Sequence, residues 1–217
     1  PATVAATSGY VVANVIFDRP PLFLIQPGDI LQGSEFLLFA LLGLCAAAIS
    51  ILYMRTILRT AKFARELNIS PLPRGLIAGV GLGLVTLWLP EITGVGQFTM
   101  RFATIDGAFS AFELGGLMLG KIALTAFCLG FGFVGGVFSP ALVVGALFGG
   151  LFWTLLSITL PDTLSSYSIY VICGMMAVTS PVIGAPLTTI LIVFELTRSY
   201  DLAIASMIAV VFSNLVT

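Results

Sequence analysis

The residues with the clearest chemical potential lie in a glycine-rich stretch, residues 130–140 (GFGFVGGVFSP). Four glycines occur there within seven residues, inside a strongly hydrophobic region that continues to Leu156. Irregular backbone at membrane depth is tolerated where it is buried in protein or lines a cavity, because no water is present to satisfy its polar groups. A helix that begins after such a break directs free N–H groups and the positive end of its dipole into that cavity. The occupant that this arrangement favours is an anion.

The residues at the end of this stretch have separate expected roles in an anion site. Pro140 marks the first turn of a helix, where no N–H donor is needed. Gly136 lets an ion approach the backbone, and the amides of Val137 and Phe138 are then free to donate hydrogen bonds to it. The Phe138 ring would wall the cavity, and Ser139 would be a secondary donor. Spacing alone leaves a second interpretation open, a glycine hinge that only lets helices pack.

Two ionisable residues in apolar runs are further candidates, Lys121 and Glu195. Lys121 would raise the local anion concentration if it faced a permeation pathway. We favour a structural role, in which Lys121 pairs with a carboxylate or a helix C-terminus or snorkels to the interface. Glu195 would be a proton carrier if it faced the membrane interior. Because Glu195 lies near Arg198 at the end of an apolar segment, we favour packing at a helix end.

The composition places the chain among integral membrane proteins. Of 217 residues, 59% are hydrophobic and 9% are charged, and the mean hydropathy is +1.13. Soluble domains carry about 25% charged residues, so the difference is decisive. The net charge of -1 argues against nucleic acid as a partner.

Residue types needed for catalysis and metal binding are scarce. The chain has no His, which removes the commonest metal ligand and general base. Cys45, Cys128 and Cys173 lie far apart in apolar runs, so we expect small buried side chains and not a disulfide or metal framework. No nucleophile with a base and no carboxylate pair stands out. The sequence therefore predicts a protein that is not an enzyme and has no metal or other cofactor.

The order of the apolar segments predicts an all-α, polytopic integral membrane protein with discontinuous and re-entrant helices. The run from Phe36 to Tyr53 is long enough to span a bilayer core. Segments of unequal length, interrupted by Gly and Pro inside apolar regions, are typical of transporters and channels. The expected helices are residues 35–65, 75–89, 109–129, 138–156, 167–178, 187–196 and 202–216. We also expect the tail of a preceding helix up to residue 17 and a half-helix within residues 91–107. Breaks are expected at residues 71–73 and 180–186.

Two rows of glycines at a spacing of four are predicted to be helix-packing faces. One row comprises Gly75, Gly79 and Gly83, and the other comprises Gly145 and Gly149. Small residues at this spacing allow two helix backbones to approach each other closely. We therefore expect each row to face a neighbouring helix.

Five of the nine basic residues cluster at the end of the first long helix and in the loop after it. By the positive-inside tendency, this region faces the cytoplasm. A phosphate- or nucleotide-binding patch is a less favoured interpretation. The five residues are Arg55, Arg59, Lys62, Arg65 and Arg74.

Two separated stretches resemble the CLC family of voltage-gated chloride channels and chloride–proton exchangers. Residues 136–142 (GVFSPAL) match the family's GxFxP element. Residues 184–190 (GAPLTTI) with residues 194–202 (FELTRSYDL) are similar to its APLT…E(L/M)T…Y segment. The order of the preceding segments also fits, so the resemblance covers essentially the full chain.

The resemblance implies a fold and a set of partners. Residues 1–217 would form one membrane-domain segment, the second of two inverted halves, in a multi-pass protein of the cell (inner) membrane. The first half and any cytoplasmic regulatory domain would lie outside it. Chloride would bind to the backbone amides of Val137 and Phe138, beside Gly136 and Ser139. A homodimer would form largely through Pro186–Thr197 and residues 202–216.

The resemblance does not choose between a channel and an exchanger, because the family's gating glutamate belongs to the first half. It also leaves the selectivity among chloride, fluoride and nitrate open. With half of the domain outside this segment, we expect the segment alone to form no pore.

Two other function classes stay open at this point. A carrier of small organic anions, coupled to cations or protons, would use the same broken-helix device, and a membrane scaffold would transport nothing. Halide flux that other small anions compete for would favour chloride transport, whereas Na⁺-dependent carboxylate uptake would favour the carrier. A bulkier residue at Gly136 would block anion access in a transporter and barely matter in a scaffold.

Overall fold

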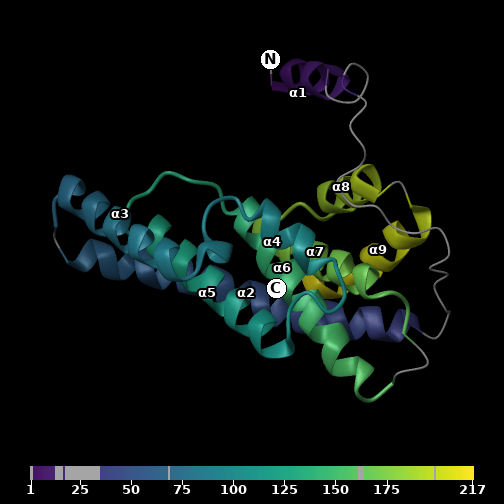
Figure 1. Ribbon diagram of the computed structural model, residues 1–217. Helices are drawn as coiled ribbons and strands as arrows, with labels where there is room; N and C mark the ends of the chain where they lie inside the picture. Colours follow the sequence, from purple (N-terminus) through teal and green to yellow (C-terminus); the bar gives the residue numbers. More distant parts are fainter. Residues whose placement is uncertain (1, 13–16, 18–34, 68, 161–163, 198) are drawn as a thin grey trace.

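The computed structural model describes the chain except for residues 1, 13–16, 18–34, 68, 161–163 and 198, and the described part is helical, with no strand (Figure 1). Its elements are α1 (Ala2–Val11), α2 (Phe36–Glu66), α3 (Pro71–Trp88), the 3-10 turn η3 (Pro90–Ile92), α4 (Gln97–Ala103), α5 (Ala111–Gly130), α6 (Phe138–Ser157), α7 (Tyr167–Ile183), α8 (Pro186–Thr197) and α9 (Tyr200–Val216). By length and composition, α2, α5 and α6 can cross a membrane. The prediction of an all-α fold with apolar helices of unequal length is confirmed.

The start of α3 differs from the prediction. We expected Pro71 and Pro73 to break the chain before a helix at Gly75, but α3 begins at Pro71. Proline is tolerated in the first turn of a helix because the N–H groups there have no partner within the helix. The prolines therefore start the helix and do not precede it.

The end of α7 also differs from the prediction. We expected an interruption from Ser180 to Pro186, but α7 continues through Pro181 to Ile183 and ends on Gly184, whose φ is 70°. Glycine adopts this left-handed conformation without steric cost, and it is the usual residue after the last turn of a helix. The helix thus extends to Ile183 and not only to residue 178, and the break before α8 is at Gly184.

Two hydroxyl groups from other helices explain why α7 continues through Pro181. Proline lacks the N–H that would bond the carbonyl four residues earlier. The carbonyl at that position, Ala177, instead accepts a 2.6 Å hydrogen bond from Ser213 of α9. The next carbonyl, Val178, accepts a 2.8 Å bond from Ser50 of α2. Polar side chains of neighbouring helices commonly satisfy such groups in membrane proteins.

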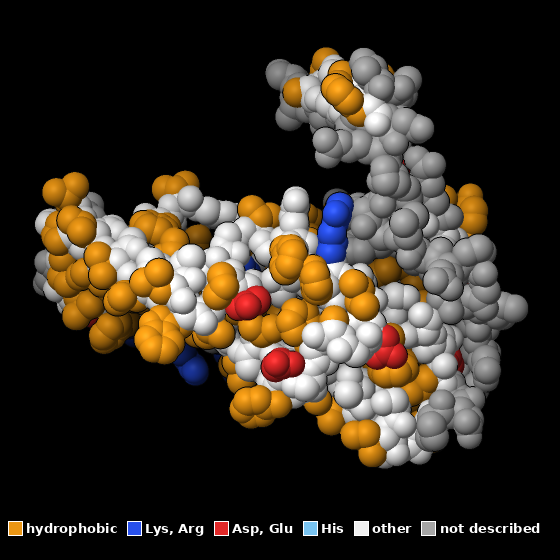
Figure 2. All heavy atoms as spheres, viewed as in Figure 1, with side chains coloured by type: hydrophobic (Ala, Val, Ile, Leu, Met, Phe, Trp, Pro, Cys, Tyr) orange, Lys and Arg blue, Asp and Glu red, His pale blue; other side chains and the backbone are white. Residues whose placement is uncertain are grey.

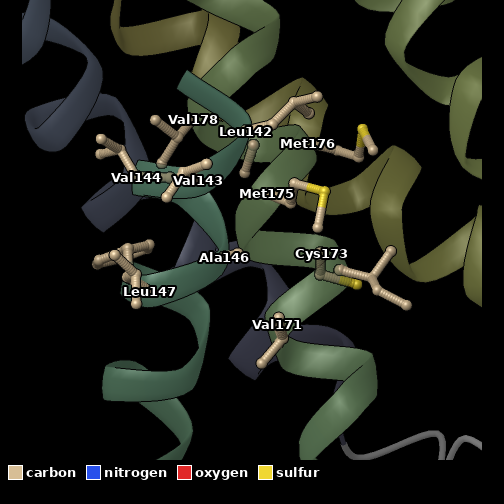
Figure 3. Packing of buried hydrophobic residues seen from close by; sticks show 14 of the residues in the cluster. Leu142, Val143, Val144, Ala146, Leu147, Val171, Cys173, Met175, Met176 and Val178 are labelled. Atoms are coloured by element: carbon tan, nitrogen blue, oxygen red, sulfur yellow. The ribbon is translucent and has the colours of Figure 1, made fainter. Parts of the chain in front are cut away.

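The core of the molecule is the contact between α6 and α7, which Figure 3 shows side by side. An added Cβ at Gly145 would lie 2.6 Å from the Met175 Cα, and one at Gly149 would lie 2.3 Å from the Tyr170 carbonyl oxygen. Only glycine lets the two backbones approach this closely. The predicted packing role of Gly145 and Gly149 is confirmed.

The other predicted glycine face, on α3, meets no helix among the described residues of this chain, so its packing role stays a prediction. An added Cβ at Gly75 or Gly83 would meet no atom within 4 Å, and one at Gly79 would touch only the Phe133 ring, at 3.9 Å. The closest approach on α3 is at Gly81, whose added Cβ would lie 2.6 Å from the ring of Phe127 on α5. Gly75, Gly79 and Gly83 lie on one face of α3, but α3 packs on α5 through a different face, which contains Gly81.

Much of the apolar surface remains uncovered in this chain. Figure 2 shows hydrophobic side chains spread over the visible face, with few charged groups among them. On α3, Leu87 is 80% exposed and Trp88 is 84% exposed. The three cysteines, all expected to be buried, differ in exposure. Cys173 is buried, Cys128 is half-buried, and Cys45 is exposed on α2. Exposure of apolar groups to this extent fits a membrane protein, since lipid or further protein can cover them.

Candidate anion site at the start of α6

The glycine-rich stretch forms an irregular connection between α5 and α6. The Gly132 φ of 103° favours glycine, and the N–H of Phe133 reaches back to the Cys128 carbonyl at 3.0 Å. Helix α6 then starts at Phe138 without a side-chain cap. Within the described residues, the backbone N–H groups of Val137, Phe138 and Ser139 have no acceptor. The helix start therefore presents unpartnered donors together with the positive end of the helix dipole.

A cavity of about 310 Å³ lies beside this connection. Gly135, Gly136 and Pro140 line it from one side, and Lys121 of α5 lines it from another. An added Cβ at Gly136 would have no atom within 4 Å, so the space that we expected at this glycine is present. The Phe138 ring does not line this cavity and is 37% exposed, so its role as a wall of the anion site stays a prediction.

The Ser139 side chain is turned to the loop before α4. Its hydroxyl donates a 2.8 Å hydrogen bond to the carbonyl of Val95. A hydroxyl has one hydrogen to donate. The expected role of this hydroxyl as a secondary anion donor therefore does not fit the structure, and only the backbone N–H of Ser139 remains free.

Lys121 holds the same loop from the side of α5. Its ammonium donates 2.8 Å hydrogen bonds to the carbonyls of Ile92 and Gly94, and the residue is 3% exposed. The positively charged group is thus paired with backbone oxygens, as required of a buried charge. The favoured structural role of Lys121 is supported: Ile92 is the last residue of the 3-10 turn η3, and Gly94 lies in the loop after it.

Tyr53 is part of this site, and our interpretation of the sequence missed it. The residue is fully buried on α2, and its hydroxyl donates a 3.2 Å hydrogen bond to the Val137 carbonyl. The two residues are separated by 84 positions in the chain. The only signal in the sequence is a phenol at the end of a long apolar run, which is too common to predict this contact.

The other polar candidates do not join the site. Glu195 is exposed on α8, and the expected contact with Arg198 lies outside the described residues. In the part of the chain that the structure describes, no group of three or more Cys, Asp or Glu residues could hold a metal ion. The site therefore consists of backbone donors, glycines and the groups that hold them.

An all-helical fold with a glycine-rich break before α6, and with unpartnered amides at the start of α6 beside a cavity, is typical of ion channels and transporters. The family model described as "Voltage gated chloride channel" matches residues 1–217, and the chain belongs to this family. The resemblance stated from the sequence is confirmed.

Two relatives of this chain carry names that fit this family. The H(+)/Cl(-) exchange transporter ClcA of Vibrio cholerae is 32% identical over 98% of this chain and 47% of its own length. The chloride channel protein CLC-f of Arabidopsis thaliana is 27% identical over 95% of this chain and 28% of its own length. The chain thus spans half or less of the curated relatives that it matches.

Solved structures show the same fold. A slow cyanobacterial Cl⁻/H⁺ antiporter superposes with a TM-score of 0.85, at 20% identity, over 95% of this chain and 48% of that protein. A CLC-type fluoride/proton antiporter superposes with a TM-score of 0.76, at 18% identity, over 94% of this chain and 49% of that protein. The fold of this chain is accordingly that of about half of a CLC membrane domain.

Proposed function

We propose that this chain is the part of an anion transport protein that supplies one wall of the anion-binding site. The bound ion is chloride, held by the backbone N–H groups of Val137 and Phe138, with the N–H of Ser139 beside them. Gly136 provides the space through which the ion approaches. The observation that carries the proposal is the set of unpartnered amides at the start of α6, next to a cavity. Backbone N–H groups can replace the hydration of an anion, while binding stays weak enough for release.

The names of the relatives favour an inorganic anion over an organic one. ClcA is named as an exchanger of H⁺ and Cl⁻, and CLC-f as a chloride channel. A carrier of organic anions and a membrane scaffold, the other two classes that fit the sequence, have no support from these relatives. The same relatives are transport proteins, which agrees with a chain that is not an enzyme and needs no cofactor besides the ion.

The assembly and orientation of the protein are part of the proposal. The chain is the second of two inverted halves, and α8 and α9 contribute to a homodimer interface. Exposed apolar side chains on these helices support this surface: Leu187 and Leu191 on α8 are 75% and 64% exposed, and Leu215 on α9 is 74% exposed. The protein lies in the cell (inner) membrane, with the end of α2 and the start of α3 toward the cytoplasm. The basic residues there support this orientation.

The test is chloride efflux from liposomes that contain a full-length protein carrying this chain, with the external pH recorded simultaneously. Chloride efflux with stoichiometric proton movement identifies an exchanger, and efflux without proton movement identifies a channel. Empty liposomes are the control. No chloride efflux above this control would contradict the proposed function and favour the glycine hinge.

A further inference from the structure

Tyr53 donates a hydrogen bond to a carbonyl that already has a donor within α6. Its acceptor, the Val137 carbonyl, already accepts the N–H of Ala141 at 3.1 Å, which is the first bond of α6. The Tyr53 hydroxyl is therefore a second donor to the same oxygen, at 3.2 Å. A carbonyl oxygen has two lone pairs and can accept both bonds.

The core of this molecule also accommodates a buried phenol without such a bond. Tyr170 on α7 is fully buried, and its hydroxyl has no partner among the described residues. Its ring packs against Phe39, with the ring centroids 5.0 Å apart. Because Tyr170 is buried without a hydrogen-bond partner, burial alone does not account for the Tyr53 hydrogen bond. We take the bond to act on its acceptor, the Val137 carbonyl.

The acceptor belongs to one peptide group that joins Val137 to Phe138. The carbonyl of Val137 and the N–H of Phe138 lie on opposite sides of this planar unit. A second donor on the carbonyl further restrains the plane, which the Ala141 bond already orients, and it polarises the peptide, which makes the N–H a stronger donor. Tyr53 thus acts on the oxygen of the group whose nitrogen is proposed to bind the anion.

We infer that Tyr53 is a positioning residue for the anion site. It restrains and polarises the Val137–Phe138 peptide through the carbonyl, without contact with the ion. This inference rests on the proposed function, because it concerns the same anion. It adds a residue of α2, far away in the chain, to the determinants of anion affinity.

The first test is chloride binding by calorimetry to a full-length protein that carries this chain. Tyr53→Phe keeps the ring and removes only the hydroxyl, and we expect it to weaken chloride binding by about twofold to tenfold, the usual effect of one net hydrogen bond. Tyr170→Phe is the matched control, since it removes a buried hydroxyl without a partner, and it should leave chloride affinity unchanged. Equal affinity in Tyr53→Phe and wild type, or an equal loss in both variants, would overturn the inference.

A second test separates positioning from simple packing. Replacement of Tyr53 by a ring-fluorinated tyrosine closely preserves the shape and makes the hydroxyl a stronger donor. We expect chloride affinity to rise above that of the wild type by about twofold, because the polarised peptide N–H binds more strongly. A purely structural role predicts no gain, and the absence of a gain would overturn the inference. Failure of the wild type itself to bind chloride would instead refute the proposed function.

Discussion

At the scale of single residues, the empty space at Gly136 gives the sharpest prediction. An added Cβ there meets no atom within 4 Å, and Gly136 is not among the glycines with positive φ, so a larger residue should fit without backbone strain. Gly136→Leu should therefore fold normally but fill the approach to the amides of Val137 and Phe138. We expect chloride affinity to fall by at least about tenfold, the loss that follows if one hydrogen bond to the ion fails. Calorimetric titration of a full-length protein with chloride measures this loss.

The control for this variant is Gly116→Leu on α5. An added Cβ at Gly116 also meets no atom within 4 Å, but this glycine does not line the cavity beside α6. Chloride affinity should be unchanged in Gly116→Leu, and both variants should melt near the wild-type temperature. Wild-type affinity in Gly136→Leu would contradict the proposed position of the ion.

At the scale of elements, the contact between α6 and α7 depends on glycine. Gly149→Ala places a Cβ 2.3 Å from the Tyr170 carbonyl oxygen and 2.8 Å from the Val171 Cα, and backbone atoms cannot yield without moving a helix. We expect a loss of stability of about 1–3 kcal/mol, typical of overpacking. Thermal unfolding in detergent measures it. Gly115→Ala is the matched control, because its added Cβ would make an ordinary contact with Leu151 at 3.9 Å. If both variants melt alike, the close approach of α6 and α7 is not required for stability.

The loop between α3 and α4 gives a second prediction at this scale. Lys121→Met should leave the carbonyls of Ile92 and Gly94 without a donor, at a cost of roughly 1–3 kcal/mol in stability. Unfolding in detergent again measures the effect. Lys62→Met is the control, since the Lys62 side chain is 77% exposed and its ion pair with Glu66 contributes little. Unchanged stability in Lys121→Met would show that the loop is held by other contacts.

The helices also differ in how far their limits and contacts could be predicted from the sequence. The start of α6 could be predicted, because glycines, a proline and an apolar run follow each other within a few residues. The course of α7 through Pro181 could not, since it depends on Ser213 and Ser50 from other helices. The Tyr53–Val137 contact is hidden for the same reason, being 84 positions apart. Local pattern thus predicted the start of α6, although not that of α3, while contacts between distant helices decide how α7 continues and what holds the site.

At the scale of the whole molecule, the part of the glycine-rich stretch just before the proposed anion site is exposed in this chain. Val134 is fully exposed, and Gly135 and Gly136 are exposed beside it. The chain spans 47% of the ClcA relative and 48% of the cyanobacterial antiporter. An ion at the amides of Val137 and Phe138 would thus have protein on one side only. A conducting path must exclude lipid and supply polar groups all around the ion, because an incompletely coordinated ion in a membrane is costly.

Residues 1–217 alone should therefore conduct no anions. The expected result for the purified segment in liposomes is chloride efflux equal to that of empty liposomes. Apolar lipid would cover the open side of the site, and lipid cannot replace the water molecules that an anion loses there. A full-length protein carrying the same chain is the positive control, and it should release chloride under the same conditions. Efflux from the segment above the empty-liposome level, abolished by Gly136→Leu, would show that this half builds a complete pathway by itself or by pairing with a second copy.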